Sequence, residues 1–297
     1  MFQKHLVSIL IFILTCFATP QLAFAEAAEA SEQKAVLVTG ASTGIGRLIA
    51  ETLAADGHFV YAGARKQADL DALDAIPNIK AVRLDVTEQD EIDAAVELVR
   101  AGGKGLHGVV NNAGVLTMGP LAEIDEDELA WIIDINVMGV YRITKAFAPL
   151  VIESKGRIVN ISSIAGVLTG TFWGPYSMTK HALEAYTDAL ADEMALFGVQ
   201  VSSVNPGNFN SKIGSKEADR VASMDFAQPG SPYAESAASL IEYMRDRSGF
   251  KEPVAVAEAV SHALFNASPK PNYMVTPNLA EAQSTIARLL EETAQFN

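Results

Sequence analysis

Only one cysteine, Cys16, occurs among the 297 residues, so the chain cannot close an internal disulfide. Basic residues are also scarce: 22 lysines and arginines are outnumbered by 36 aspartates and glutamates, which leaves a formal net charge of −14. Such an acidic surface disfavours binding to nucleic acid or to anionic lipid. The five histidines lack ligand spacing with carboxylates or cysteines, so we predict no metal site.

The first 25 residues differ in pattern from the rest of the chain. A basic pair precedes the apolar run Leu6–Phe17, and Ala23-Phe24-Ala25 fits the small-residue cleavage site of a secretory signal peptide. The run is short for a membrane-spanning helix of about 20 residues, although extension to Ala25 could form an anchor. We predict a signal peptide at residues 1–25 and a periplasmic or secreted protein. A membrane-anchored or cytoplasmic chain is the alternative, and membrane contact is expected only if the segment is uncleaved.

Residues 26–33 are rich in Ala and Glu and are predicted to be a linker, and residues 34–297 suffice for one α/β domain. Short apolar runs alternate with amphipathic stretches, which is typical of parallel strands joined by helices. We expect strands at Ala35–Val38, Phe59–Ala62, Ala81–Leu84, Gly108–Asn111, Arg157–Ile161 and Val199–Val204. Helices are expected to include Ile92–Val99 and Leu129–Leu150.

A glycine-rich turn, residues 39–46, follows the first predicted strand, and the residues after it repeat with helical period. A strand that leads through such a turn into a helix presents backbone N–H groups to a pyrophosphate, and the missing Cβ atoms let the phosphate approach. An ordinary turn would also use glycine for its positive φ, but the elements on both sides favour a nucleotide site. The expected contacts are Gly40, Ser42, Thr43, Gly44, Ile45 and Gly46.

Tyr176 and Lys180 stand four residues apart at the start of an apolar-periodic stretch, so a helix would project both side chains from one face. A nearby ammonium lowers the pKa of a phenol from its ordinary value near 10, which lets tyrosine exchange a proton during a reaction. Taken alone, this spacing is common by chance, and a surface lysine after a half-buried tyrosine explains it. Together with a nucleotide site, it indicates an oxidoreductase.

The order of the motifs resembles that of the short-chain dehydrogenase/reductase family, in its compact single-domain branch. The resemblance runs from about residue 34 to residue 204 and rests on Thr39-Gly-x-x-x-Gly44-x-Gly46, Asn111-Asn112-Ala113-Gly114, Asn136, Ser163, Tyr176-x-x-x-Lys180 and Pro206-Gly207. It implies a Rossmann-like doubly wound parallel sheet with helices on both faces. It also implies an NAD(P)-dependent oxidoreductase that interconverts a secondary alcohol and a ketone by hydride transfer, and a homo-oligomer.

The resemblance implies roles for four polar residues. Tyr176 would be the general acid/base, and Lys180 would lower the pKa of that phenol and bind the nicotinamide ribose. Ser163 would hydrogen-bond the substrate oxygen, and Asn136 would hold a water in a proton relay to Lys180. Apolar residues surround Asn136 in the sequence, so its side chain needs hydrogen-bond partners.

Ala64 stands after the second predicted strand, where an NAD enzyme is expected to carry an acidic residue for the ribose 2′-OH. The next residue, Arg65, can bind a 2′-phosphate through two hydrogen bonds, which favours NADP(H). NAD(H) stays an alternative, because Thr43 replaces a second basic residue that many NADP-dependent members carry. The resemblance adds Asp85 and Val86 at the adenine, Asn112 at the adenosine ribose, and Ser211 at the carboxamide or phosphate of the cofactor.

The segments expected near the nicotinamide contain the apolar residues Leu116, Met118, Leu168, Phe172, Trp173, Phe209, Ile213, Met224 and Phe226. They would suit a lipophilic small-molecule substrate that is steroid-, retinoid- or fatty-acyl-like, or they would simply pack beneath a lid. Residues 208–232 are rich in Gly, Ser, Pro and charge and are predicted to form a mobile loop over the substrate.

Two other functions are open. The first is an epimerase or lyase of the extended branch of the family, which the glycine spacing and Asn112-Ala113-Gly114 disfavour. The second is a dinucleotide-binding protein without catalysis, which would not need Ser163, Tyr176 and Lys180 together.

Overall fold

The computed structural model describes residues 33–210 and 212–294. These residues belong to one compact unit, Gln33–Asn297. The predicted signal peptide or anchor, residues 26–32 of the predicted linker, and Ser211 lie outside the described residues. Gln33 is exposed, and its side-chain amide donates a hydrogen bond to the carbonyl oxygen of Gly57 at 3.0 Å.

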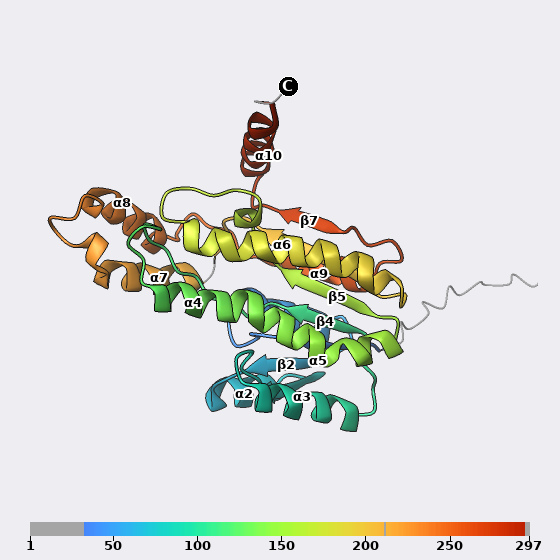
Figure 1. Cartoon of the computed structure of the whole chain (residues 1–297). Helices are drawn as coiled ribbons and strands as arrows, with labels where there is room; N and C mark the ends of the chain where they lie inside the picture. Colours follow the sequence, from blue (N-terminus) through green and yellow to red (C-terminus); the bar gives the residue numbers. More distant parts are fainter. Residues whose placement is uncertain (1–32, 211, 295–297) are drawn as a thin grey trace, which may run out of the picture. The chain divides into compact units, whose positions relative to one another are not determined.

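Seven parallel strands form one sheet in the order β3-β2-β1-β4-β5-β6-β7 (Figure 1). Their bounds are β1 Ala35–Val38, β2 Phe59–Ala64, β3 Ile79–Arg83, β4 Gly108–Asn111, β5 Arg157–Ile161, β6 Gln200–Pro206 and β7 Asn272–Val275. The chain runs outward from β1 to β3 and then returns to β4 on the other side of β1. This reversal confirms the predicted doubly wound sheet, and it creates the crevice at the carboxyl ends of the strands where such sheets bind ligands.

Helices cover both faces of the sheet because successive side chains of a strand point in opposite directions. In β1, Val36 and Val38 pack with α1 and α9, whereas Ala35 and Leu37 pack with α3 and α5. Figure 1 shows α3, α5 and α6 on one side of the strands. The helices are α1 Gly44–Ala55, α2 Gln67–Asp74, α3 Gln89–Ala101, α4 Glu126–Ile133, α5 Val140–Glu153, α6 Gly174–Ala195, α7 Lys212–Ser223, α8 Ala234–Arg245, α9 Val254–Phe265 and α10 Leu279–Ala294.

The predicted strands β1, β4 and β5 have the observed bounds, and β2, β3 and β6 differ by two residues or fewer at each end. The strand β7 was not expected from the sequence, because it is an edge strand of four residues and follows Pro271. It pairs with β6, and the amide of Gly207 then donates to Val275 O at 2.8 Å. The strand thus helps to fix the turn after β6.

The helix expected at Leu129–Leu150 is interrupted by a π-helical turn, Asp134–Gly139, between α4 and α5. Such turns occur often at functional sites, and this one contains Asn136. The stretch Glu126–Glu153 is the one helix, within the described part of the chain, that is long and apolar enough to cross a membrane. Half of its apolar window is buried inside the protein, as expected for a core helix.

The segment 208–232 is mostly helical rather than an irregular loop, which corrects the expectation of a loop. It contains α7 and a 3₁₀ turn, Asp225–Ala227. Ala218 and Val221 of α7 are buried against Leu116 and Phe172, so an apolar stripe explains the helix. The mobility of the segment stays a prediction.

Candidate active site

A cavity of about 560 Å³ lies at the carboxyl ends of the strands. The residues that follow β1 to β6 all contribute to its wall, which fits the position that the crossover between β1 and β4 predicts. Of the predicted site residues that the structure describes, all except Asn136 line this cavity: Gly40, Ser42, Thr43, Gly44, Ile45, Gly46, Arg65, Asp85, Val86, Asn112, Ser163, Tyr176 and Lys180.

The glycine turn at one end of the cavity is held from behind by Asn112. The side-chain amide of Asn112 donates to the carbonyl oxygens of Thr39 and Gly40 at 2.9 and 3.1 Å. A Cβ atom on Gly46 would collide with that amide and lie 2.5 Å from Gly40 O. Gly40 itself has a φ of +64°, which only glycine adopts readily. The turn therefore requires glycine at both positions, and its cradle fits a closely approaching phosphate.

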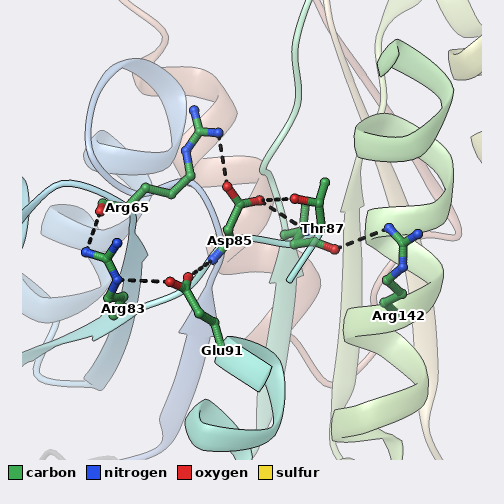
Figure 2. A network of polar contacts seen from close by, with 7 residues as sticks. Arg65, Arg83, Asp85, Thr87, Glu91 and Arg142 are labelled. Atoms are coloured by element: carbon green, nitrogen blue, oxygen red, sulfur yellow. Dashed lines mark hydrogen bonds and ion pairs between the residues drawn. The ribbon is translucent and has the colours of Figure 1, made fainter. Parts of the chain in front are cut away.

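Beside the turn, Arg65 and Asp85 point toward each other from the ends of β2 and β3, as Figure 2 shows, with Arg65 Nη1 3.2 Å from Asp85 Oδ2. Burial acts to raise the pKa of Asp85, but hydrogen bonds from Thr87 and Arg65 outweigh it and hold the pKa below its ordinary value. Glu91 Oε2 accepts a hydrogen bond from the backbone amide of Asp85 at 2.7 Å and so fixes the chain just after β3. A small adjoining pocket is lined by Ser42, Thr43, Arg65, Lys66 and Asp69.

Asn136 is buried and fully engaged. Its Oδ1 accepts the amide of Val115 at 2.8 Å, and its Nδ2 donates to Val115 O at 2.9 Å and to Thr179 Oγ1 at 3.1 Å. The expected need for partners is thus met by the chain after β4 and by α6. Asn136 ties the π-helical turn to the helix that carries Tyr176 and Lys180.

At the other end of the cavity, Ser163, Tyr176 and Lys180 come together from the end of β5 and the first turns of α6. The side chains of Ser163 and Tyr176 both line the cavity, and Ser163 is near enough to lower the pKa of the phenol. Lys180 Nζ donates to the carbonyl oxygen of Ile161 at 2.9 Å and lies 5.6 Å from the centre of the Tyr176 ring. The helical spacing of four residues therefore does bring the ammonium to the phenol.

The pKa values of this pair differ from the expectation. Burial raises the pKa of Tyr176 to about 12, against a lowering by the Ser163 hydrogen bond. Burial also lowers the pKa of Lys180 to about 8, while the carboxylate of Glu184 raises it. Burial therefore dominates the pKa of the phenol, and Ser163, rather than Lys180 as expected, is the group that opposes it. Tyr176 is therefore protonated at neutral pH and suited to donate a proton.

The substrate end has a more polar wall than the sequence analysis predicted. Leu116, Trp173 and Phe209 line the cavity, but Met118, Phe172 and Phe226 are buried in the core beneath α7 and α8. Six residues that the sequence analysis missed also contribute: Trp131, Glu217, Arg220, Tyr243, Met244 and Arg247. The interpretation that apolar residues pack beneath a lid therefore holds for part of the set.

Two charged residues of α7 form a network at this end. Glu217 is 3% exposed, and its Oε1 accepts the amide of Met118 at 3.1 Å. Burial raises the pKa of Glu217 to about 7, against the hydrogen bonds from Met118 and Thr117. Arg220 pairs with Glu128, and its guanidinium carbon lies 4.5 Å from the centre of the Trp131 ring. The positive charge of Arg220 is thus balanced inside the protein.

The doubly wound sheet and the hydroxyl pair beside a buried lysine define a class, the nucleotide-dependent α/β oxidoreductases. The family model described as short chain dehydrogenase matches residues 34–222, so the chain belongs to the short-chain dehydrogenase family. The chain is therefore an NAD(P)-dependent oxidoreductase that binds a nucleotide cofactor and a small-molecule substrate. The resemblance in the sequence is confirmed.

Named relatives are dehydrogenases and reductases. The mitochondrial D-beta-hydroxybutyrate dehydrogenase of Rattus norvegicus is 34% identical over 267 residues, which cover 83% of this chain and 78% of the relative. Retinol dehydrogenase 16 of Homo sapiens is 31% identical, with 81% and 80% covered. The NADPH-dependent 3-dehydrocapnine reductase of Ornithobacterium rhinotracheale is 35% identical, with 81% and 87% covered. A solved short-chain dehydrogenase from Streptomyces avermitilis superposes with a TM-score of 0.73 at 32% identity, covering 89% and 94%.

Proposed function

We propose that the protein interconverts a secondary alcohol and a ketone with NADP(H), and that the substrate is lipophilic. The observation that carries this proposal is that Ser163, Tyr176 and buried Lys180 line the same cavity as the glycine turn, with Lys180 Nζ 5.6 Å from the centre of the Tyr176 ring. A proton donor and a phosphate cradle at opposite ends of one cavity suit a dinucleotide whose reactive ring reaches the donor.

In the proposed reaction, the bound nicotinamide supplies or accepts the hydride. Tyr176 donates its proton to the carbonyl oxygen during reduction and takes it back during oxidation. Ser163 donates a hydrogen bond to the same oxygen, where negative charge develops. Lys180 stabilises the resulting phenolate and would bind the ribose, and Asn136 would hold a water in a proton relay to Lys180.

The preference for NADP(H) rests on the small pocket beside the glycine turn. Arg65 and Lys66 both line it, and a 2′-phosphate there would receive charge-assisted hydrogen bonds. Asp69 also lines this pocket, and Asp85 pairs with Arg65, so the charge is only partly available. The dependence of the 3-dehydrocapnine reductase on NADPH supports the same preference. Val86 and Asn112 would then contact the adenosine, and Ser211 the other end of the cofactor.

The proposed lipophilic substrate rests on Leu116, Trp131 and Trp173, which line the same cavity as Tyr176. A retinol dehydrogenase among the relatives fits an apolar substrate. The D-beta-hydroxybutyrate dehydrogenase is instead named for a small hydroxy acid. These relatives make it useful to compare apolar and acidic ketones.

The direct test is to follow oxidation of NADPH and of NADH with a panel of ketones that differ in length and charge. We expect faster turnover with NADPH and with long apolar ketones. Turnover with no ketone of the panel would reject the proposed reaction, and faster turnover with NADH would reject the proposed cofactor preference.

Two further properties are proposed for the whole chain. Residues 1–25 would direct export or anchor the protein, with residues 26–33 as the linker, and the catalytic domain would form a homo-oligomer as the resemblance implies. N-terminal sequencing of the protein from its native host should then give a chain that begins at Glu26. A soluble cytoplasmic chain that begins at Met1 would contradict the export signal, and light scattering would measure the oligomer.

A further inference from the structure

Arg247 lies just after α8 and lines the main cavity. Its Nη2 donates to the carbonyl oxygen of Phe209 at 2.5 Å, and its guanidinium carbon lies 3.7 Å from the centre of the Phe250 ring. Phe209 follows β6 closely and lines the same cavity. The backbone carbonyl and the ring together hold the guanidinium in one orientation.

Arg220 of α7 and Arg247, which follows α8, both line the cavity but differ in their partners. Arg220 pairs with Glu128, and its Nε lies 3.7 Å from Glu217. Among residues 33–210 and 212–294, no carboxylate forms an ion pair with Arg247. Glu281 acts electrostatically on the neighbouring Tyr243, and its Oε1 accepts hydrogen bonds from both the amide and the side chain of Asn208. Arg247 therefore presents an unbalanced positive charge to the cavity of an acidic protein.

The surroundings leave room for a ligand at this guanidinium. Gly214 of α7 has no side chain. A Cβ there would lie 3.7 Å from Arg247 Nη1, so the glycine leaves free the space that a side chain would fill. Tyr243, four residues earlier, also lines the cavity, and the positive charge of Arg247 lowers the pKa of that phenol against the effect of burial. A planar cation that is fixed, unpaired and next to open space is the arrangement that binds an oxyanion through two hydrogen bonds.

We propose that Arg247 is an anion-binding residue of this cavity and takes an oxyanion of the bound molecules. This inference rests on the proposed function and extends it. The oxyanion can come from either of two sources: the diphosphate of the nucleotide, or an acidic group on the substrate away from the reacting carbonyl. In both cases Arg247 makes the contact outside the residues that the family model matches, which end at residue 222.

The test compares Arg247→Gln with Arg245→Gln. Arg245 is the matched control, because it belongs to the same end of α8, pairs with Asp219 at 2.9 Å and does not line the cavity. Dissociation constants for NADPH and NADH are measured by nucleotide fluorescence without turnover. Steady-state kinetics then compare a ketone that carries a carboxylate with its methyl ester.

If the diphosphate is the source, Arg247→Gln should weaken NADPH and NADH equally, by about tenfold or more. If the substrate is the source, nucleotide binding should stay unchanged, and kcat/KM should fall about tenfold or more for the acid but not for its ester. Arg245→Gln should change neither. Arg247→Met, which replaces the guanidinium next to Phe250 with an apolar side chain of similar length, repeats the test if the Gln variant does not fold.

The inference is overturned if the wild type binds NADPH and reduces ketones while Arg247→Gln and Arg245→Gln behave alike in every measurement. A wild type that neither binds NADPH nor reduces any ketone would instead reject the proposed function, and the inference with it. The two failures are therefore distinguishable.

Discussion

The nucleotide end and the substrate end of the cavity are built from different materials. At the nucleotide end, the wall is main chain that follows parallel strands, and Asn112 fixes it by bonding to two carbonyl oxygens. At the substrate end, the wall includes side chains from α4, α7 and α8, such as Trp131, Glu217 and Tyr243, and Arg247 after α8. A backbone cradle can bind a phosphate whatever the side chains around it, whereas a wall of side chains can change with the substrate.

Tyr176 lies at the end of the cavity opposite the glycine turn and is the proposed proton donor, so its substitution should have the largest effect. Tyr176→Phe removes the proton that the reaction needs but little volume, and general acid–base catalysis contributes about 10²- to 10⁴-fold. We expect kcat to fall by that factor, while NADPH binding changes little. Measurement of kcat and of the NADPH dissociation constant on the same preparation checks this.

Lys180→Ala is the companion variant, since it should weaken nucleotide binding as well as kcat. A Tyr176→Phe enzyme that retains most of its kcat would show that another group moves the proton. The proton donor would then have to be sought among the other residues that line the cavity.

The second prediction concerns a buried carboxyl at the substrate end. Glu217 has a pKa of about 7 in the folded protein, above its ordinary 4.5. Between these values the folded state holds a proton that the unfolded state has lost, so unfolding becomes easier as pH rises toward 7. The shift corresponds to a loss of up to about 3 kcal/mol, which is complete above pH 7 and absent below pH 4.5.

Glu217→Gln should remove this loss, because an amide does not titrate. Urea unfolding at pH 5 and pH 8 measures the free energy of unfolding of both proteins, and the variant should gain relative to the wild type at pH 8. Glu235→Gln, on an exposed part of α8, is the control. Parallel pH profiles for Glu217→Gln and the wild type would mean that burial does not perturb this carboxyl.

This contrast explains how far the sequence could predict the site. The glycine turn, Asn112, Ser163, Tyr176 and Lys180 are predictable because each is fixed by spacing next to a strand end or on one helical face. Glu217 and Arg247 are not, because they reach the cavity only after α7 and α8 pack over it, and a single charged residue on a helix carries no distinguishing pattern.

The same reasoning applies to the fold. Buried strands are predictable as apolar runs, and six of the seven strands were found. The edge strand β7 has few buried residues to mark it, and the π-helical turn at Asn136 comes from tertiary contacts with Val115 and Thr179 rather than from a local signal. The raised pKa of Tyr176 likewise depends on how deeply α6 is covered.

The third prediction tests the backbone cradle at the nucleotide end. Gly46→Ala places a methyl group 2.5 Å from Gly40 O. This oxygen belongs to the backbone, so the whole glycine turn would have to shift to relieve the clash. We expect the free energy of unfolding to fall by about 1–3 kcal/mol, as in other overpacked sites, and nucleotide affinity to fall with it. Gly249→Ala is the control, because no atom lies within 4 Å of its added Cβ. If both variants bind NADPH as the wild type does, the close packing of the turn is not required for binding.

The smallest effect is expected at Arg65, a side chain that adds to the backbone wall of the nucleotide end. Arg65→Ala should weaken NADPH binding by about tenfold, since one charge-assisted contact to the 2′-phosphate is lost. NADH, which lacks that phosphate, should bind as before. Stability should change by less than about 1 kcal/mol, because the ion pair with Asp85 involves an Arg65 side chain that is 64% exposed. If Arg65→Ala weakens the binding of NADPH and NADH equally, Arg65 contacts a part of the nucleotide that both have. Lys66, which lines the same small pocket, would then be the residue that selects NADP(H) over NAD(H). The Lys66→Ala variant is therefore measured alongside.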